Sequence, residues 1–186
     1  MRDQIEGKSL NYPATSSKRS FLEQPLLSRV RRNHGLEHAT LHILARRHPR
    51  VGLGGHSDSG GFWVIGNVPI EEVHQAVEEA LGRLRKGETD LAIHPHCGTN
   101  FVTAGVLAGT AAGLAMLGAG QRTRDKFERL PLAMTLATLA LILAQPLGLW
   151  LQERITTSGE MGDLHVIEIV TNRRGGLTAY RVVTRG

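Results

Sequence analysis

Two long, uncharged apolar stretches constrain the fold of this chain more than any other feature. They cover residues 101–120 (FVTAGVLAGTAAGLAMLGAG) and residues 130–151 (LPLAMTLATLALILAQPLGLWL). A helix needs roughly 20 mostly apolar residues to cross a hydrocarbon core of about 30 Å, and both stretches reach that length. In a soluble bundle, two such helices would need a large partner layer, which the remaining, largely polar residues cannot supply. We therefore predict two membrane-spanning helices in contact with a lipid bilayer.

A short polar segment separates the two stretches, so we expect an antiparallel helical hairpin. Gly105, Gly109 and Gly113 recur every four residues on one helix face, a pattern that lets helix backbones approach closely in lipid. We predict that this face packs against another copy of the chain, as a homo-oligomer, or against the alanines of the second helix: Ala133, Ala137, Ala140 and Ala144. Pro146 is predicted to kink or end the second helix.

The net charge of +5 indicates an anionic partner. Because the basic residues are dispersed and are not interleaved with aromatic residues, we expect no nucleic-acid binding, and anionic lipid headgroups account better for the charge. Residues 1–20 are polar throughout, so we expect no secretory signal peptide. We predict a multi-pass protein of the cell membrane with a cytoplasmic polar part. The positive-inside rule does not decide this orientation, because both ends of the hairpin are basic.

The polar parts of the chain contain both helical and strand patterns. Apolar residues at helical spacing predict a helix over Pro25–Arg47, and the glycine-rich segment after it predicts a β-hairpin. Pro69 suits the start of a second helix, which a short strand at Leu91–Ile93 is expected to follow. Near the C-terminus, residues 164–171 and 177–184 alternate in polarity around a glycine-containing turn and predict another β-hairpin.

These elements predict the α+β fold class. We expect a small polar domain of helices and a β-hairpin, a two-helix transmembrane hairpin, and a C-terminal β-hairpin. The corresponding parts are a disordered tail over residues 1–20, a polar α/β part over 21–99, the transmembrane hairpin over 100–151, and the C-terminal β-hairpin over 152–186, packed on the polar part.

The first candidate site lies in the predicted helix 25–47, where residues 34–38 read HGLEH and fit the pattern H-x-x-E-H. Residues i and i+4 share a helix face, so the imidazoles of His34 and His38 can bind one metal ion. Glu37 lies beside them, with the spacing of the inverzincin metallopeptidases, in which the carboxylate is the general base. Gly35 inside a helix costs about 1 kcal/mol relative to alanine, which indicates close packing at that point or a nearby helix start.

A second cluster directly precedes the first apolar stretch, where residues 94–100 read HPHCGTN. It contains two imidazoles and the single cysteine of the chain, and thiolate together with imidazole ligands suits zinc. We predict a zinc site formed by His34 and His38 with one or two of three further ligands: His94, His96 and Cys97. An open fourth position would be hydrolytic, whereas a fully occupied set would be structural.

The two motifs together resemble the YqhQ-like family, which comprises uncharacterised bacterial membrane proteins described as predicted metal-dependent enzymes. The resemblance covers about residues 30–120 and rests on four short matches: His34-Gly35, Glu37-His38, His94-Pro95 and Cys97-Gly98-Thr99. This chain has Asn33 and Ala39 where that family has an aromatic and a basic residue, which favours a smaller sister family of unknown function. The resemblance implies a metal site but no known reaction.

Three hypotheses for the function follow. The first is a membrane-bound zinc-dependent hydrolase, with a peptidase as one candidate, in which Glu37 is the catalytic base. The second is a non-catalytic membrane module, stapled by its metal, that serves as an assembly subunit. In the third, no metal binds, and the imidazoles and the thiol form a hydrogen-bonded core network.

Overall fold

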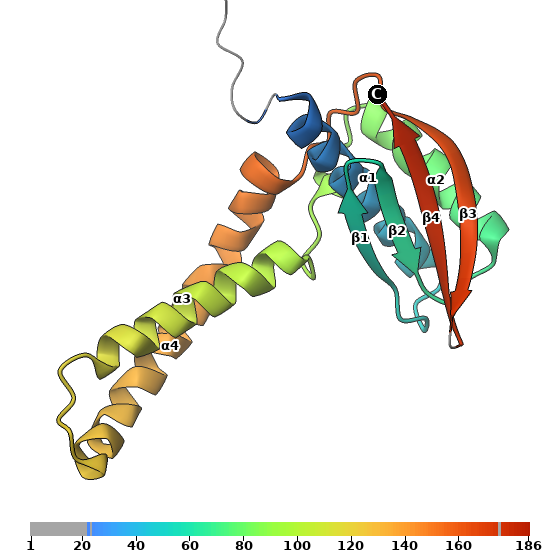
Figure 1. The fold of residues 1–186 in the computed structure, drawn as a ribbon. Coiled ribbons are helices and arrows are strands. Elements are labelled where there is room, and N and C mark those ends of the chain that lie inside the picture. Colours follow the sequence, from blue (N-terminus) through green and yellow to red (C-terminus); the bar gives the residue numbers. More distant parts are fainter. Residues whose placement is uncertain (1–21, 23, 175) are drawn as a thin grey trace, which may run out of the picture.

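The computed structural model describes residues 22, 24–174 and 176–186. A helical hairpin projects from a compact part in which a β-sheet packs on helices (Figure 1), so the predicted α+β fold class is confirmed. The predicted disordered tail, residues 1–20, lies outside the described residues.

The polar part is built on one sheet. Within the described residues, four antiparallel strands pair in the order β1-β2-β4-β3. Both predicted β-hairpins form, and β4 of the C-terminal hairpin pairs with β2 of the first, in the register Phe62↔Val182. The C-terminal hairpin therefore completes the sheet of the polar part. The strand bounds are β1 Gly54–Asp58, β2 Gly61–Ile65, β3 His165–Arg174 and β4 Leu177–Arg185.

Helices α1 (Pro25–Arg47) and α2 (Ile70–Arg85) lie behind the sheet in Figure 1. Alternate residues of β4 are buried, as the two-residue period of a strand with one covered face requires. The core between helices and sheet contains fully buried large side chains, and each contributes about 1.5–3 kcal/mol by leaving water. They include Leu36 and Leu44 of α1, Val73 of α2, Phe62 of β2 and Val182 of β4.

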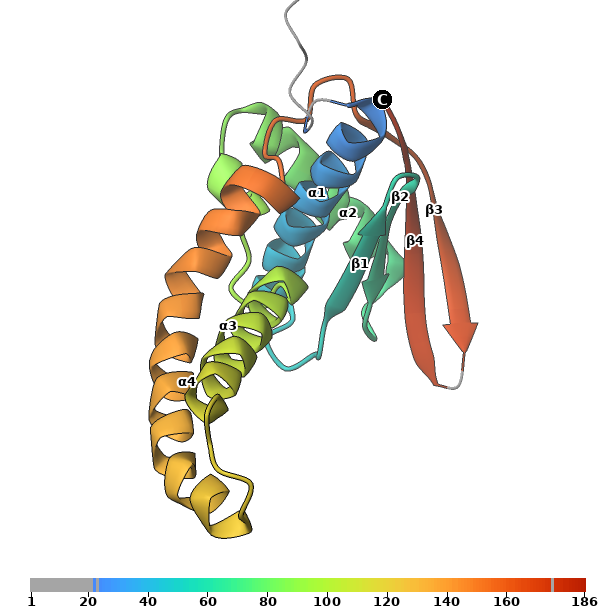
Figure 2. The same cartoon turned by 60° about the vertical axis from the view of Figure 1, so that its left-hand side comes forward.

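The projecting hairpin consists of α3 (Gly98–Met116) and α4 (Thr123–Leu151), which pack along each other (Figure 2). Among the described residues, these two helices are long and apolar enough to cross a membrane. Their apolar side chains face outward: Phe101 is 67% exposed, Met134 68% and Leu143 67%. A core helix of a soluble protein would be mostly buried, so this exposure favours association with a membrane.

Two details of these elements need comment. Of the two alternatives predicted for Pro146, ending the second helix is excluded, because α4 continues to Leu151 and passes into a π-helical turn, Gln152–Thr156. The segment predicted as a strand at Leu91–Ile93 instead forms a 3₁₀ turn, η2 (Thr89–Ala92). Its backbone carbonyls do not pair with a strand; the carbonyls of Ala92 and Ile93 accept hydrogen bonds from histidines of α1.

The glycine face of α3 does not pack on α4. Of the two packing partners predicted for this face, the alanines of the second helix are therefore excluded. Within the described chain, no atom lies within 4 Å of a Cβ built at Gly105, Gly109 or Gly113. The covered face of α3 is instead formed by buried and half-buried residues spaced by four: Thr103, Leu107, Ala111 and Ala115. A polar contact holds α3 in this rotation about its own axis: Asn100 Oδ1 accepts a 2.7 Å hydrogen bond from Gln152 at the end of α4.

Candidate metal centre

Helix α1 brings His34 and His38 onto one face, as the four-residue spacing predicts. Their ring centroids are 4.4 Å apart. Gly35, between them, lies against a backbone: a Cβ at this position would overlap the carbonyl oxygen of Ser158. The predicted close packing at Gly35 is therefore present, and it brings the segment after α4 onto α1.

Backbone carbonyls orient both imidazoles. His34 Nδ1 lies 3.0 Å from the carbonyl oxygen of Thr156, and His38 Nδ1 lies 2.7 Å from that of Ala92. A carbonyl oxygen only accepts, so each Nδ1 carries the hydrogen and each Nε2 of the neutral ring keeps a free lone pair. Metal-binding histidines are held by the same kind of contact. Burial lowers the pKa of His38, which keeps that imidazole in the neutral form that binds metals.

Cys97 completes the cluster from the start of α3. Its Sγ lies 3.4 Å from His34 Nε2 and accepts a hydrogen bond from the Thr99 N–H, also at 3.4 Å. Burial raises the pKa of the Cys97 thiol, but the contacts of the thiol with the His38 side chain and with Thr99 outweigh it and hold this pKa below its usual value. A lowered pKa favours the thiolate, which is the form that binds a metal.

The ligand atoms of these three residues lie within 4.8 Å of one another. A tetrahedral zinc site, with bonds of about 2.0–2.3 Å, places its ligand atoms about 3.3–3.8 Å apart. The separation of 3.4 Å between Cys97 Sγ and His34 Nε2 lies within that range. The two ligand atoms that lie farthest apart, at up to 4.8 Å, would have to come about 1 Å closer to reach the spacing of a tetrahedral site.

His94 and His96 line the same cavity but lie farther from the cluster. The ring centroid of His94 is 5.6 Å from that of His38, and its Nδ1 accepts a 3.2 Å hydrogen bond from the backbone N–H of His96. Burial, with the neighbouring His42 and His96, lowers the pKa of His94 to about 4. The side chain of His96 is exposed. Of the three further ligands predicted, the fold thus brings Cys97 nearest to His34 and His38.

Glu37 is a buried carboxylate beside the cluster. Its side chain is 4% exposed, and Oε2 has no hydrogen-bond partner among the described residues. Burial raises the pKa of Glu37 to about 7, although His34 and the Ser57 side chain act in the opposite direction. A carboxyl group with a pKa near neutrality both takes up and releases protons readily at physiological pH.

The cluster and Glu37 line one cavity of about 340 Å³ between α1, β1 and the loop 94–99. Strand β1 lies close to the carboxylate, since a Cβ at Gly55 would overlap Glu37 Oε1. Gly55 and Ser57 line this cavity too, although the sequence did not mark them as site residues. Their only signal was the glycine-rich composition of the segment, which predicts a hairpin and says nothing about what packs against it.

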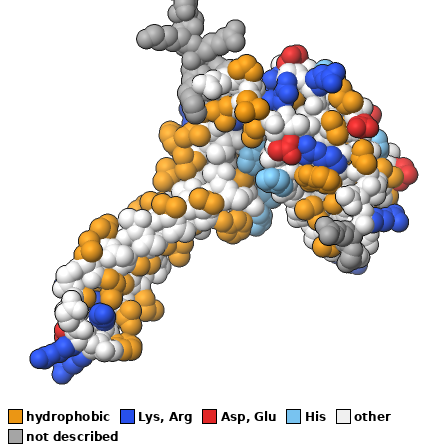
Figure 3. All heavy atoms as spheres, in the orientation of Figure 1, with side chains coloured by type: hydrophobic (Ala, Val, Ile, Leu, Met, Phe, Trp, Pro, Cys, Tyr) orange, Lys and Arg blue, Asp and Glu red, His pale blue; other side chains and the backbone are white. Residues whose placement is uncertain are grey.

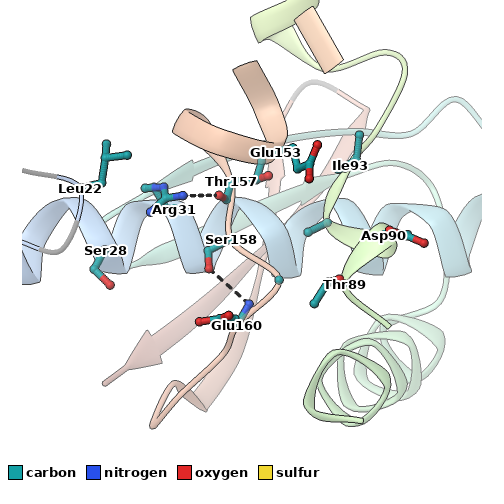
Figure 4. Close-up of a pocket in the computed structure, with 12 residues that line it drawn as sticks. Leu22, Ser28, Arg31, Thr89, Asp90, Ile93, Glu153, Thr157, Ser158 and Glu160 are labelled. Atoms are coloured by element: carbon teal, nitrogen blue, oxygen red, sulfur yellow. Dashed lines mark hydrogen bonds between the residues drawn. The ribbon is translucent and has the colours of Figure 1, made fainter. Parts of the chain in front are cut away.

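A second cavity, of about 460 Å³, lies on another side of α1 (Figure 4). Arg31 donates a 3.0 Å hydrogen bond to the Thr157 carbonyl there, and the Ser158 hydroxyl accepts one from the Glu160 N–H. None of the predicted site residues lines this cavity, and among the described residues the group able to hold a metal is that of His34, His38 and Cys97. The smaller cavity is therefore the candidate functional site.

Comparison with known proteins places the candidate site inside a family of unknown function. A family model described as a domain of unknown function, DUF6391, matches residues 29–169. An uncharacterized protein of Picosynechococcus sp. is 39% identical over 139 residues, which covers 69% of this chain and 66% of that protein. The chain thus spans about two thirds of the length of this relative. No solved structure matches the chain. The region matched by the family model contains both motifs and both long apolar helices.

Proposed function

We propose that this chain, which belongs to the DUF6391 family, is a membrane-bound hydrolase. The hydrolase would use zinc held by His34, His38 and Cys97. One observation carries the proposal. Two oriented imidazoles and a thiol with a lowered pKa meet within 4.8 Å in a cavity that also contains a buried carboxylate without a hydrogen-bond partner among the described residues.

The donor set fits zinc and leaves room for a reactant. Thiolate and imidazole ligands suit zinc, and three protein ligands leave a fourth position open in catalytic sites. A closed structural site would need a fourth protein ligand, for which His94 is placed nearest. Its Nδ1 is already engaged with the His96 N–H, and its ring is 5.6 Å from that of His38. An open position facing the cavity therefore agrees better with the geometry.

Zinc bound at this position would polarise a water and the carbonyl of a substrate. Glu37 Oε2 accepts a proton from the water as its oxygen adds to the carbonyl carbon. It then donates this proton to the leaving oxygen or nitrogen as the bond to carbon breaks. The products are a carboxylic acid and an alcohol or amine. The carbonyls of Thr156 and Ala92 hold the two imidazoles in place throughout.

The same proposal places α3 and α4 across the cell membrane, with the polar part in the cytoplasm and no nucleic acid as partner. The outward-facing apolar side chains of both helices support membrane contact. The open glycine face of Gly105, Gly109 and Gly113 supports a homo-oligomer formed through α3. Neither comparison names the YqhQ-like family, so that resemblance stays a prediction.

A metal-stapled assembly module is the second candidate, and one observation favours it. The cluster joins α1 to Cys97, the residue directly before α3, and His34 also contacts the turn after α4. A metal there would fasten the hairpin to the polar part even without catalysis. This candidate predicts that His34→Ala unfolds the polar part and that no exchangeable water binds the metal.

The test compares metal content and hydrolysis in the full chain. We expect about one zinc per chain, and a cobalt-substituted sample should show a thiolate charge-transfer band. Glu37→Gln should keep the zinc and lose about 100-fold or more in hydrolysis of nitrophenyl acetate or a quenched peptide, as loss of a general base does. The exposed Glu78→Gln of α2 is the matched control. Full activity in Glu37→Gln would exclude the role of general base.

A further inference from the structure

We infer that the substrate is a single-chain membrane amphiphile, whose acyl chain lies in a groove between α3 and α4 while its ester or amide carbonyl reaches the metal centre. This inference rests on the proposed hydrolase and names its class of substrate. A mostly apolar groove, the residue His96 that it shares with the metal cavity, and the exposure of its walls on the outside of the hairpin support it.

The groove has a volume of about 590 Å³, within the range of small-molecule sites. Its walls are mostly apolar and come from both helices: Phe101 and Ala104 of α3, and Leu141, Ala144 and Leu149 of α4. The residues from α3 belong to its first two turns, and those from α4 to its last turns. The groove therefore lies at the base of the hairpin, beside the polar part.

The groove adjoins the metal cavity. His96 lines both, and the next residue, Cys97, is a proposed metal ligand at the N-terminus of α3. Figure 3 shows histidine side chains gathered where the hairpin meets the polar part, with hydrophobic side chains along the hairpin. A molecule with an apolar chain and a polar end fits this arrangement, since the chain would lie in the groove and the polar end in the cavity.

Three polar side chains line the groove, those of His96, Asn100 and Gln145, which are too few to pair with the backbone of a bound peptide. Asn100 is engaged at both ends of its amide: Nδ2 donates to the Pro95 carbonyl at 2.8 Å, and Oδ1 accepts from Gln152 at 2.7 Å. A peptide brings an N–H and a carbonyl for each residue, and these need partners in an apolar environment. A hydrocarbon chain has no such groups.

The groove opens toward the region where lipid would lie. Phe101 and Leu141, on opposite walls, are exposed to the outside of the hairpin, as are most neighbouring apolar residues of both helices. An amphiphile already in the bilayer can enter sideways, so its chain never crosses water. Hydrolysis then consumes one water: the bond between the carbonyl carbon and the headgroup oxygen or nitrogen breaks, and a fatty acid and a protonated headgroup form.

The first experiment measures binding without requiring catalysis. The full chain is placed in vesicles of phosphatidylcholine and phosphatidylglycerol that contain a lysophosphatidylcholine with a diazirine in its acyl chain, and crosslinked residues are mapped by mass spectrometry. We expect crosslinks to concentrate on the groove residues of α3 and α4, in wild type and in Glu37→Gln alike. Ala104→Trp, which fills the groove, should remove most of them, and Leu141→Trp on the other wall should do the same.

Ala108→Trp is the matched control, because Ala108 lies one turn farther along the same face of α3 and outside the groove. It should leave the crosslinking pattern as in wild type. Crosslinks spread evenly along both helices, with no loss in either groove variant, would overturn the inference. Retained zinc content shows that each variant is folded.

The second experiment measures substrate preference with nitrophenyl esters from acetate to palmitate. We expect kcat/KM to rise with chain length in wild type and in Ala108→Trp, and the ratio of palmitate to acetate to fall about ten-fold or more in Ala104→Trp. Equal hydrolysis of all esters would overturn the inference and leave the hydrolase standing. Preferred cleavage of an apolar peptide would also overturn it. Groove crosslinking without any hydrolysis would instead reject the hydrolase while supporting the acyl-chain site.

Discussion

Gly35 shows how one residue shapes the candidate metal centre. Without a side chain, it lets the Ser158 backbone lie directly on α1, where the Ser158 N–H donates a 3.0 Å hydrogen bond to the Arg31 carbonyl. Two residues earlier, the carbonyl of Thr156 reaches His34 Nδ1. The helix-propensity cost of glycine, about 1 kcal/mol, is offset by this close contact. The contact therefore links a small residue of the motif to the orientation of His34, a proposed metal ligand.

Replacing Gly35 should damage both stability and metal binding. In Gly35→Ala the new Cβ overlaps backbone, which cannot move aside as a flexible side chain can. We expect a loss of about 1–3 kcal/mol in stability and about 10–100-fold in zinc affinity, because the carbonyl that orients His34 shifts. Thermal unfolding in detergent and competition with a chelator measure the two effects.

Gly82→Ala in α2 is the control for this change. Nothing in the described chain lies within 4 Å of a Cβ at Gly82, and this residue is inside a helix. The substitution should therefore stabilise the protein by about 0.5–1 kcal/mol without altering zinc binding. Wild-type zinc affinity in Gly35→Ala would show that the Ser158 contact does not position the ligand.

At the scale of elements, the π-helical turn Gln152–Thr156 connects the hairpin to the candidate metal centre. Gln152 is fully buried; its Oε1 accepts a 3.0 Å hydrogen bond from the His94 N–H, and its Nε2 donates to Asn100. The far end of the same turn supplies the Thr156 carbonyl to His34. One short turn thus fixes the histidine–cysteine loop, the start of α3 and His34 of α1.

Gln152→Leu should loosen this junction. The substitution leaves the His94 N–H and the Asn100 amide oxygen without their partner, at a cost of about 1–3 kcal/mol for each buried group. We expect lower stability and about 10–100-fold weaker zinc binding, since the loop that carries Cys97 is no longer held. The exposed Gln75→Leu of α2 should change neither quantity. Unchanged zinc binding in Gln152→Leu would mean that the loop is held by other contacts.

Elements with strong local patterns were predicted well from sequence. The helix Pro25–Arg47 has the predicted bounds, and both β-hairpins form where alternation and turn residues indicate them. The strand predicted at Leu91–Ile93 failed because the backbone carbonyls there bond to imidazoles 50 or so residues earlier in the chain, and no local pattern encodes such a contact.

For the whole molecule, the projecting hairpin determines how the protein can sit in a membrane. Both ends of the hairpin return to the polar part, and the loop between α3 and α4 lies at its far tip (Figure 1). If the helices span the bilayer, this loop and the polar part lie on opposite sides. The proposed cytoplasmic location of the polar part then places the loop outside the cell.

Cysteine labelling with a membrane-impermeant maleimide tests this arrangement. Gln121→Cys in the loop should be labelled on intact cells, whereas Glu78→Cys on the exposed side of α2 should be labelled only in inverted vesicles. Cys97 is buried, so it should contribute little background. Labelling of both introduced cysteines from the same side would show that the hairpin does not cross the membrane.

The sequence by itself determined the features that depend on local geometry. Helical periodicity places His34, Glu37 and His38 together, and two uncharged stretches of sufficient length specify the long apolar helices, because both properties follow from residue spacing along one element. The tertiary structure alone decided which of three candidate ligands meets that helix, which face of α3 packs on α4, and how the two β-hairpins join. These outcomes depend on contacts between residues far apart in the chain, such as Cys97 with His34 and Asn100 with Gln152, whose geometry is fixed only when the whole chain packs.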